Sequence, residues 1–151
     1  MTQSISCQIM DALADLLQGT AAAGQSDIPG VNALFLDSAR VASLPDGVVI
    51  GLDQEGQASD EIATTCRLSS TLPVVVTIIR TRAPNDPPNW QLLDSFYVAV
   101  HSRIMANRRL GGLCDDIQSI GREHVSELKA CAVRGSYSVR YQTLEADVTA
   151  T

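Results

Sequence analysis

Hydrophobic residues recur at helical spacing near the start of the chain. The stripe consists of Ile5, Ile9, Leu13, Leu16 and Leu17. Residues three and four positions apart lie on one face of a helix, so this pattern predicts a first amphipathic helix. Ser4 or Ser6 can cap its first turn, and the pattern stops at Gly19, a residue type common just after helix ends.

Three short apolar runs follow, with the sequences VNALFL, ARVASL and GVVIGL. They are separated by an Asp-Ser pair at 37–38 and by Pro-Asp-Gly at 45–47, which is a strong turn signal. This arrangement predicts hairpin-like strands. The next segment, DQEGQASDEIA, is polar and acidic, so we expect an exposed, mobile loop over about residues 53–62.

An alternation of apolar and polar residues marks the clearest strand. One side carries Cys66, Leu68, Leu72, Val74, Val76 and Ile78, and the other carries Arg67, Ser69, Thr71 and Thr77. A period of two is that of a half-buried strand. Pro73 has no N–H to donate to a neighbour, so it favours an edge position or a bulge within this strand.

A second helical stripe follows the linker APNDPPN. Its members are Leu93, Phe96, Tyr97, Val100 and Ile104. We expect Asp86 to cap this helix, with Pro87 at its first position, where a missing N–H costs nothing. Arg108 and Arg109 then complement the negative end of the helix, and the glycine pair at 111–112 ends it.

The last apolar alternation predicts a long closing strand. It runs through Cys131, Val133, Tyr137, Val139 and Tyr141. Before it, a short strand at Ile117 to Ile120 is followed by a turn, with His124 in a polar loop. The fold class is therefore α+β: a single domain over residues 1–151, with two main helices packed on one face of a mostly antiparallel sheet. Residues 146–151 form a flexible tail.

Charge is divided unevenly along the chain, whose net charge is −6. The first 61 residues hold nine acids and one arginine, whereas residues 62–144 carry a net +4 and the last seven residues −2. This split is that of an uneven solvated surface, or of two halves that meet between neighbouring subunits of a head-to-tail ring. The length of 151 residues suits one domain, and no apolar run approaches the roughly 18 residues of a membrane helix.

The four cysteines are widely spaced and form no C-x-x-C pair. Cys7, Cys66, Cys114 and Cys131 are therefore expected to be reduced thiols of a protein made in a cytoplasm. The N-terminal segment lacks the basic leader of a secretory signal. A Cys–His nucleophile would need one of these thiols to meet His101 or His124 in space, and no local motif indicates it.

Other chemistry receives little support from the residues. The turn APNDPPN has no glycine to bring backbone N–H groups to a phosphate, which argues against a nucleotide site there. The group Cys114, Asp115, Asp116 and His124 has ligand atoms but no known metal spacing, so we expect an exposed acidic turn and no cofactor. Asp11 and Asp15, one helical turn apart, are best interpreted as a solvated helix face.

Direct nucleic-acid binding is also disfavoured. Arg103, Arg108 and Arg109, with Arg80 and Arg82, offer positive charge. Aromatic residues make up only 4% of the chain and the overall balance is acidic. These arginines are better suited to helix-end charges or to subunit contacts.

Several stretches, in order, resemble one protein family. The long strand TCRLSSTLPVVVTIIRT, the segment RRLGGLCDDI and the closing YSVRYQTLEAD are similar to those of tail terminator proteins of long-tailed bacteriophages, also called tail completion or minor tail proteins. The resemblance covers most of the chain and is strongest from Ala63 to Asp147. None of these motifs is catalytic.

The resemblance implies a structural virion protein without enzymatic activity or cofactor. Such proteins form hexameric rings that cap the head-proximal end of the tail tube, stop its polymerisation and offer a surface to head-completion (stopper) proteins. Double-stranded DNA passes through the lumen without sequence-specific binding. The expected location is the tail or neck of the virion, after assembly in the host cytoplasm.

Two sets of charged residues are the candidate interfaces of such a ring. They are Asp53, Glu55, Asp60, Glu61, Arg103, Arg108, Arg109, Arg134 and Arg140. We expect the acidic loop to face the lumen or a partner, and Trp90, Phe96 and Tyr97 to anchor the second helix to the sheet or to a neighbouring subunit. The alternatives are a head–tail joining or stopper protein and, in another class, a small cytoplasmic hydrolase or transferase that uses Cys114 or Cys131 with a histidine.

Overall fold

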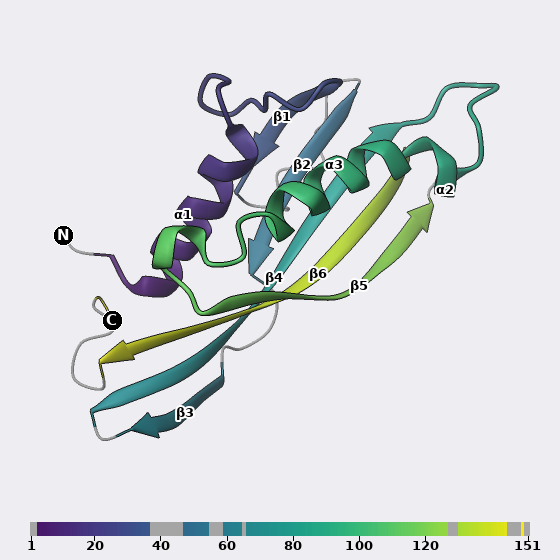
Figure 1. The fold of residues 1–151 in the computed structure, drawn as a ribbon. Coiled ribbons are helices and arrows are strands. Elements are labelled where there is room, and N and C mark those ends of the chain that lie inside the picture. The colour runs from purple at the N-terminus through teal and green to yellow at the C-terminus, as the bar shows by residue number, and fades with distance from the viewer. Residues whose placement is uncertain are drawn as a thin grey trace.

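The computed structural model describes residues 3–36, 47–54, 59–64, 66–126, 130–144 and 149 (Figure 1). The elements are α1 (Ile5–Gln18), β1 (Val31–Phe35), β2 (Val48–Gln54), β3 (Ser59–Thr64), β4 (Arg67–Thr81), α2 (Asn89–Leu92), α3 (Asp94–Met105), the short 3-10 helix η2 (Leu110–Gly112), β5 (Asp116–Ser126) and β6 (Ala130–Leu144). This content is that of an α+β protein with two main helices, α1 and α3.

The strands form one six-stranded sheet in the order β1-β2-β4-β6-β5, and β3 pairs with β4 beside this order. β1 and β2 run parallel, and the other described pairings are antiparallel. The mostly antiparallel sheet predicted from the sequence is thus confirmed in outline. β3 and the ends of β4 and β6 extend beyond the helices as an arm (Figure 1).

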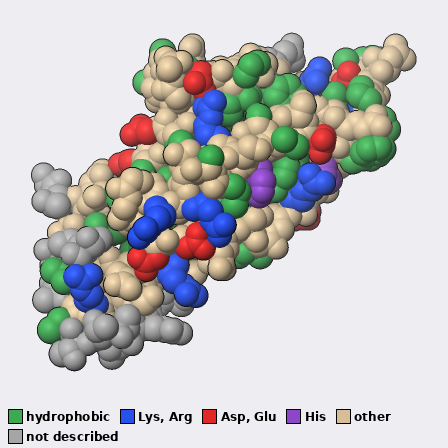
Figure 2. All heavy atoms as spheres, viewed as in Figure 1, with side chains coloured by type: hydrophobic (Ala, Val, Ile, Leu, Met, Phe, Trp, Pro, Cys, Tyr) green, Lys and Arg blue, Asp and Glu red, His purple; other side chains and the backbone are tan. Residues whose placement is uncertain are grey.

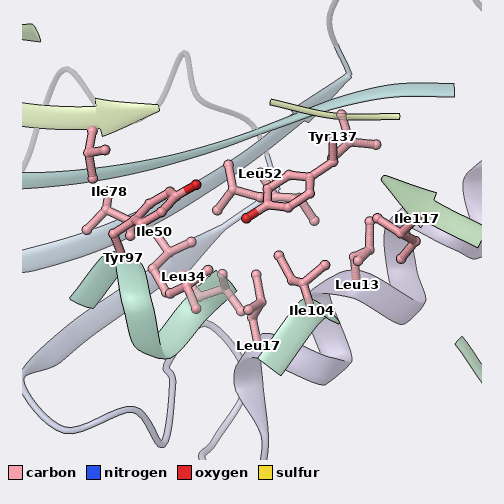
Figure 3. Close-up of a cluster of buried hydrophobic side chains, with 14 of the residues drawn as sticks. Leu13, Leu17, Leu34, Ile50, Leu52, Ile78, Tyr97, Ile104, Ile117 and Tyr137 are labelled. Carbon is pink, nitrogen blue, oxygen red and sulfur yellow. The ribbon is translucent and has the colours of Figure 1, made fainter. Parts of the chain in front are cut away.

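A single hydrophobic cluster joins α1 and α3 to one face of the sheet (Figure 3). The predicted apolar stripe of α1 belongs to this cluster, and its residues Ile9, Leu13 and Leu17 are fully buried. The inward side chains of the sheet are Ile50, Leu52, Leu72, Val74, Val76, Ile78, Ile117, Val133, Tyr137 and Val139. Each fully buried Leu or Ile contributes about 1.5–3 kcal/mol, so this cluster holds the helices on the sheet.

Helix α1 begins and ends as its sequence predicts. The Ser4 hydroxyl accepts a hydrogen bond from the backbone N–H of Cys7 at 3.3 Å and caps the first turn. Gly19 leaves the helix with a φ of 61°, a left-handed conformation that suits glycine. A side chain at Gly19 would also collide with the carboxylate of Asp27.

The two long central strands also follow their predicted alternation. β4 and β6 have 15 residues each and pair continuously from Arg67 opposite Leu144 to Thr81 opposite Ala130. The pairing of β4 with β6 continues through Pro73. On its other side, β4 pairs with β3 up to Thr71 and with β2 from Val74, so Pro73 lies in the gap between these two pairings. The proline is therefore at a local edge on that side of β4, one of its two expected positions.

Of the three runs predicted to form hairpin-like strands near the N-terminus, the first and third are β1 and β2, which pair directly with each other. The two strands are parallel, with Leu34 opposite Ile50. Parallel strands need a crossover connection, which a run of turn signals does not reveal. The ARVASL run, residues 39–44, lies outside the described residues, as do residues 146–151 apart from Thr149.

The predicted acidic loop at about 53–62 is also corrected. β2 continues to Gln54, and Ser59–Thr64 is strand β3, paired with the beginning of β4. A strand without an apolar alternation can form here because it pairs with the existing strand β4. Cys66, expected within the strand, instead lies exposed in the connecting turn with a φ of 79°.

The second helix is shorter than predicted and interrupted. Asp86 does not cap it: its carboxylate accepts the N–H of Ala83 at 2.6 Å and closes a local turn. α2 begins at Asn89, with Pro88 at the N-cap, and Leu93 separates it from α3. The predicted apolar stripe is nevertheless buried, apart from Phe96, which is half-buried against the core.

Helix α3 ends at Met105, before the two arginines expected at its C-terminus. Arg109 instead precedes η2, and Gly111 and Gly112 have φ values of 70° and 96°. The chain can make this tight reversal because glycine tolerates positive φ. The turn brings the following strand, β5, alongside β6.

Candidate interaction surfaces

Arg103 forms an internal tie. It makes an ion pair with Asp27 and donates a hydrogen bond to the carbonyl oxygen of Leu16 at 3.4 Å. This hydrogen-bonded guanidinium, helped by the N–H of Thr20, holds the pKa of the Asp27 carboxyl below its ordinary value. Arg103, predicted to contact an acidic partner, thus joins α3 to the segment after α1.

Three arginines gather where η2 leads into β5. Arg108 donates to both carboxylate oxygens of Asp116, at 2.8 and 3.0 Å. Arg140 lies opposite Asp116 in the β5–β6 ladder, and Arg109 is exposed beside Arg108. The pKa of Asp116 is lowered, first by the Arg108 hydrogen bond. We call Arg108, Arg109 and Arg140 the arginine corner; Figure 2 shows basic and acidic side chains gathered over this end of β5.

The remaining predicted interface residues are scattered along the sheet. Arg134 is half-buried in β6, opposite Glu123. Asp53 is half-buried in β2, whereas Asp60 and Glu61 belong to β3. Glu55 lies outside the described residues. The structure therefore brings the arginine corner together, whereas Asp53 belongs to one strand and Asp60 and Glu61 to another.

The β5 edge is a surface that the sequence analysis missed. A register shift between Ser119 and Gly121 makes Ile120 a bulge residue, and its side chain is 66% exposed. Trp90 on α2 is 61% exposed and Val98 on α3 is 51% exposed. The sequence signals for this surface were Trp90, named as a candidate anchor to a neighbouring subunit, and Ile120, an isoleucine in an otherwise polar stretch.

Polar groups frame these apolar side chains. Trp90 lines a shallow hollow of about 360 Å³ with Gln91, Asp94, Arg122 and His124. Arg122 lies 3.5 Å from the Asp94 carboxylate and 5.0 Å above the centre of the Tyr97 ring. We define the β5 surface as Trp90, Val98, Ile120, Arg122 and His124. Trp90, expected to anchor a helix to the sheet or to a neighbour, is not buried against the sheet.

The opposite edge of the sheet carries a groove. It has a volume of about 670 Å³ and is lined by Asp11, Ala14, Asp15, Gln18, Ala23, Gly24, Leu34, Phe35 and Leu36. Asp11 and Asp15 are one helical turn apart on α1. Leu36, just after β1, is 49% exposed. We call this the α1–β1 groove; it is acidic on one wall and apolar on the other.

A cluster of rings lies under the β5 surface. The Tyr137 hydroxyl and His101 Nδ1 share a hydrogen bond of 2.8 Å, and the imidazole stacks on Tyr97 at 5.5 Å between centroids. Burial raises the pKa of Tyr137 well above its ordinary value. Gly135 makes room for both tyrosine rings. These contacts hold α3 on β6 and explain the half-buried position of His101.

The cysteine thiols are free, and two of them are buried. Cys114 Sγ donates to the carbonyl oxygen of Arg108 at 3.2 Å, and burial raises its pKa to about 11. Burial also raises the pKa of Cys131, whose thiol points to the carbonyl oxygen of Arg80. A nucleophilic cysteine needs a lowered pKa, so both environments disfavour the thiolate.

Known families and curated proteins offer no match to this chain. Neither a protein-family model nor a curated protein sequence matches it. Within the described ranges, no group of three His, Cys, Asp or Glu side chains is placed to hold a metal ion. The helices of those same ranges include none that is long and apolar enough to span a membrane. The surfaces of the fold therefore carry the functional proposal.

Proposed function

We propose that the protein is a structural component of a long-tailed bacteriophage, a tail terminator. In this proposal it forms a homohexameric ring at the head-proximal end of the tail tube, stops tube polymerisation and presents a surface to a head-completion protein. The observation that carries the proposal is the pair of different, solvent-exposed surfaces at opposite edges of one sheet. A ring of identical subunits requires two such different surfaces on each subunit.

The family resemblance points in the same direction. The RRLGGLCDDI segment covers η2 and the start of β5, where the arginine corner lies. This part of the resemblance thus falls on an exposed, charged surface, whereas the other two stretches form the paired central strands β4 and β6. In the proposed ring, the arginine corner contacts an acidic partner at the tube or at the head-completion protein.

Two alternative functions can be distinguished from a tail terminator by experiment. A head–tail joining or stopper protein would use the same kinds of surface but would bind portal complexes instead of tube ends. A Cys–His hydrolase or transferase is less well supported, because the Cys114 and Cys131 thiols are buried and their pKa values are raised. Replacing both cysteines by serine should leave ring assembly intact in the first two cases and abolish turnover in the third.

The test is native mass spectrometry of the full chain, alone and with the tail tube protein of the same phage, with negative-stain imaging of the mixtures. We expect a six-subunit species in at least one sample and shortened or capped tubes. A protein that stays monomeric and leaves tube length unchanged would overturn the proposal. Binding to portal complexes without binding to tubes would replace it by the stopper function.

A further inference from the structure

We infer that neighbouring copies of this chain join head to tail, with the β5 surface of one copy seated in the α1–β1 groove of the next. The inference rests on the proposed function, because it takes the occupant of the groove to be a second copy. It adds the residues that make the contact and its direction around the ring.

Exposed apolar side chains gather at these two surfaces. Among the described residues, the large exposed hydrophobic side chains are Leu36, Trp90, Val98 and Ile120. Three of them belong to the β5 surface, and the fourth lines the α1–β1 groove. Exposed apolar residues gathered in this way mark contact sites, and tryptophan is among the residues most enriched at the centre of such contacts.

The two surfaces also differ in shape. Trp90 and the bulged Ile120 are exposed at the β5 surface, where Trp90 lines a shallow hollow of about 360 Å³, whereas the α1–β1 groove has about 670 Å³. The groove volume of about 670 Å³ lies within the ~300–1,000 Å³ of pockets that enclose small organic ligands. By volume, the groove has room for an indole ring.

Each surface carries a charged side chain that the other can pair with, while Asp94 and Glu123 add negative charge beside Arg122 on the β5 surface. Asp11 and Asp15 line the groove, and Arg122 lies beside Trp90 on the β5 surface. The Arg122 guanidinium is paired with Asp94 at 3.5 Å, and both side chains are about half exposed. Such a pair is weak in water, so Arg122 can exchange Asp94 for the carboxylates of a neighbouring groove.

The form of β5 indicates how the contact is made. Pairing of β5 with a strand of the next copy would extend the sheet, but the bulge at Ile120 interrupts the edge, and Arg122 and Glu123 add charge to it. Bulges and charges are the usual protection of an edge strand against such pairing. The contact therefore consists of side chains in a groove rather than of a continued hydrogen-bond ladder.

The position of the two surfaces sets the symmetry. β1 and β5 are opposite ends of the strand order, so a single contact uses a different edge of each copy (Figure 1). Because the two edges lie on opposite sides of the molecule, the same two copies cannot make the contact twice, as a two-fold dimer would require. Repetition produces a ring if the rotation closes and a filament if it does not.

The test uses two charge reversals, Asp15→Arg and Arg122→Glu, in the full chain. Each alone places like charges in the contact, and we expect subunit association to weaken by about tenfold or more. Asp115→Arg and Arg67→Glu are the matched controls, since both residues are exposed and lie outside the two surfaces. Circular dichroism checks that every variant is folded, and sedimentation velocity measures association.

Mixing the two reversed variants provides the decisive measurement. In an equimolar mixture, one contact keeps the original pair of Asp15 and Arg122, and the next has both charges reversed and is again complementary. We therefore expect assemblies of alternating composition by native mass spectrometry. A mixture as dissociated as its components would overturn the inference.

A second pair of outcomes separates this inference from the proposed function. Rings that survive both single reversals would overturn the contact yet leave the terminator proposal standing. A wild-type protein that is monomeric with tubes present would instead remove that proposal, and the contact between copies with it.

Discussion

Strands β6 and β5 are neighbours paired from Cys131 to Arg140, yet their surroundings differ completely. Every second residue of β6, from Cys131 to Thr143, is buried, whereas β5 is exposed from Gln118 to His124. Among the described strands, β6 has a neighbour on both sides and β5 on one side only. Packing is thus concentrated at the centre of the sheet, whereas the β5 edge stays exposed to solvent.

Two isoleucines of β5 give the largest expected difference between a buried and an exposed position. Ile117 is fully buried opposite Val139, whereas Ile120 is the exposed bulge residue. We expect Ile117→Ala to lower the free energy of unfolding by about 2–5 kcal/mol, because it leaves a cavity in the core. Ile120→Ala should change it by no more than about 0.5 kcal/mol and weaken subunit association instead. Urea unfolding and sedimentation velocity measure the two effects; equal losses of stability would contradict the comparison.

A pair of glycines gives the next largest expected difference between the two strands. A Cβ at Gly135 of β6 would lie 3.1 Å from the Tyr97 ring and 3.2 Å from the Tyr137 ring, whereas one at Gly121 of β5 meets nothing within 4 Å. Overpacking predicts that Gly135→Ala lowers the free energy of unfolding by about 1–3 kcal/mol. Gly121→Ala is the control, expected within about 0.5 kcal/mol of the parent in thermal unfolding. A neutral Gly135→Ala would show that the rings shift freely.

The hydrogen bond below the β5 surface tests a smaller effect. Tyr137→Phe removes the hydroxyl that bonds to His101 Nδ1. We expect a loss of about 0.5–1.5 kcal/mol in the free energy of unfolding, since the ring remains and only one hydrogen bond is lost. His101→Phe combined with Tyr137→Phe completes a double-mutant cycle, and additive losses would deny the coupling.

The smallest expected effect is a change in the pH dependence of stability, caused by Asp116 where β5 pairs with β6. Arg108 and Arg140 flank Asp116, whose folded pKa lies below its ordinary value of about 3.9. A lowered folded pKa stabilises the protein above the unfolded pKa, and this contribution is lost as the pH falls through the folded pKa. Asp116→Asn should therefore reduce the difference in urea midpoint between pH 6 and pH 3. An unchanged pH profile would mean that the pair adds nothing measurable, as many exposed pairs do.

The elements that sequence patterns predicted well are those whose burial follows a local period. The stripe of α1 and the alternations of β4 and β6 appear in the structure nearly as expected. β3 and most of β5 were missed because their polar residues have no period to detect; they become strands only by pairing with β4 and β6. The break at Leu93 was missed for a related reason, since the apolar stripe continues through it.

The candidate interface residues divide in the same way. The sequence pointed to arginines near 108 and 140 as exposed charge, and the structure places them together around Asp116. It also suggested Arg103 as a contact residue, but Arg103 is tied to Asp27, a residue far away in the chain. Whether an arginine can contact another molecule depends on the acidic residue that lies beside it in the folded protein. The spacing of residues along the chain does not reveal that neighbour.

By itself, the sequence determined the class of the fold, the buried faces of α1, β4 and β6, and the absence of a recognisable catalytic motif, because all of these depend on residue type and short-range periodicity. Three features are visible only in the tertiary structure: the parallel pairing of β1 with β2, the exposed edge of β5, and the exposed positions of Trp90 and Ile120. These depend on which strand lies next to which, and so on contacts between residues distant in the chain. The two surfaces at opposite edges of the sheet are a product of that pairing order.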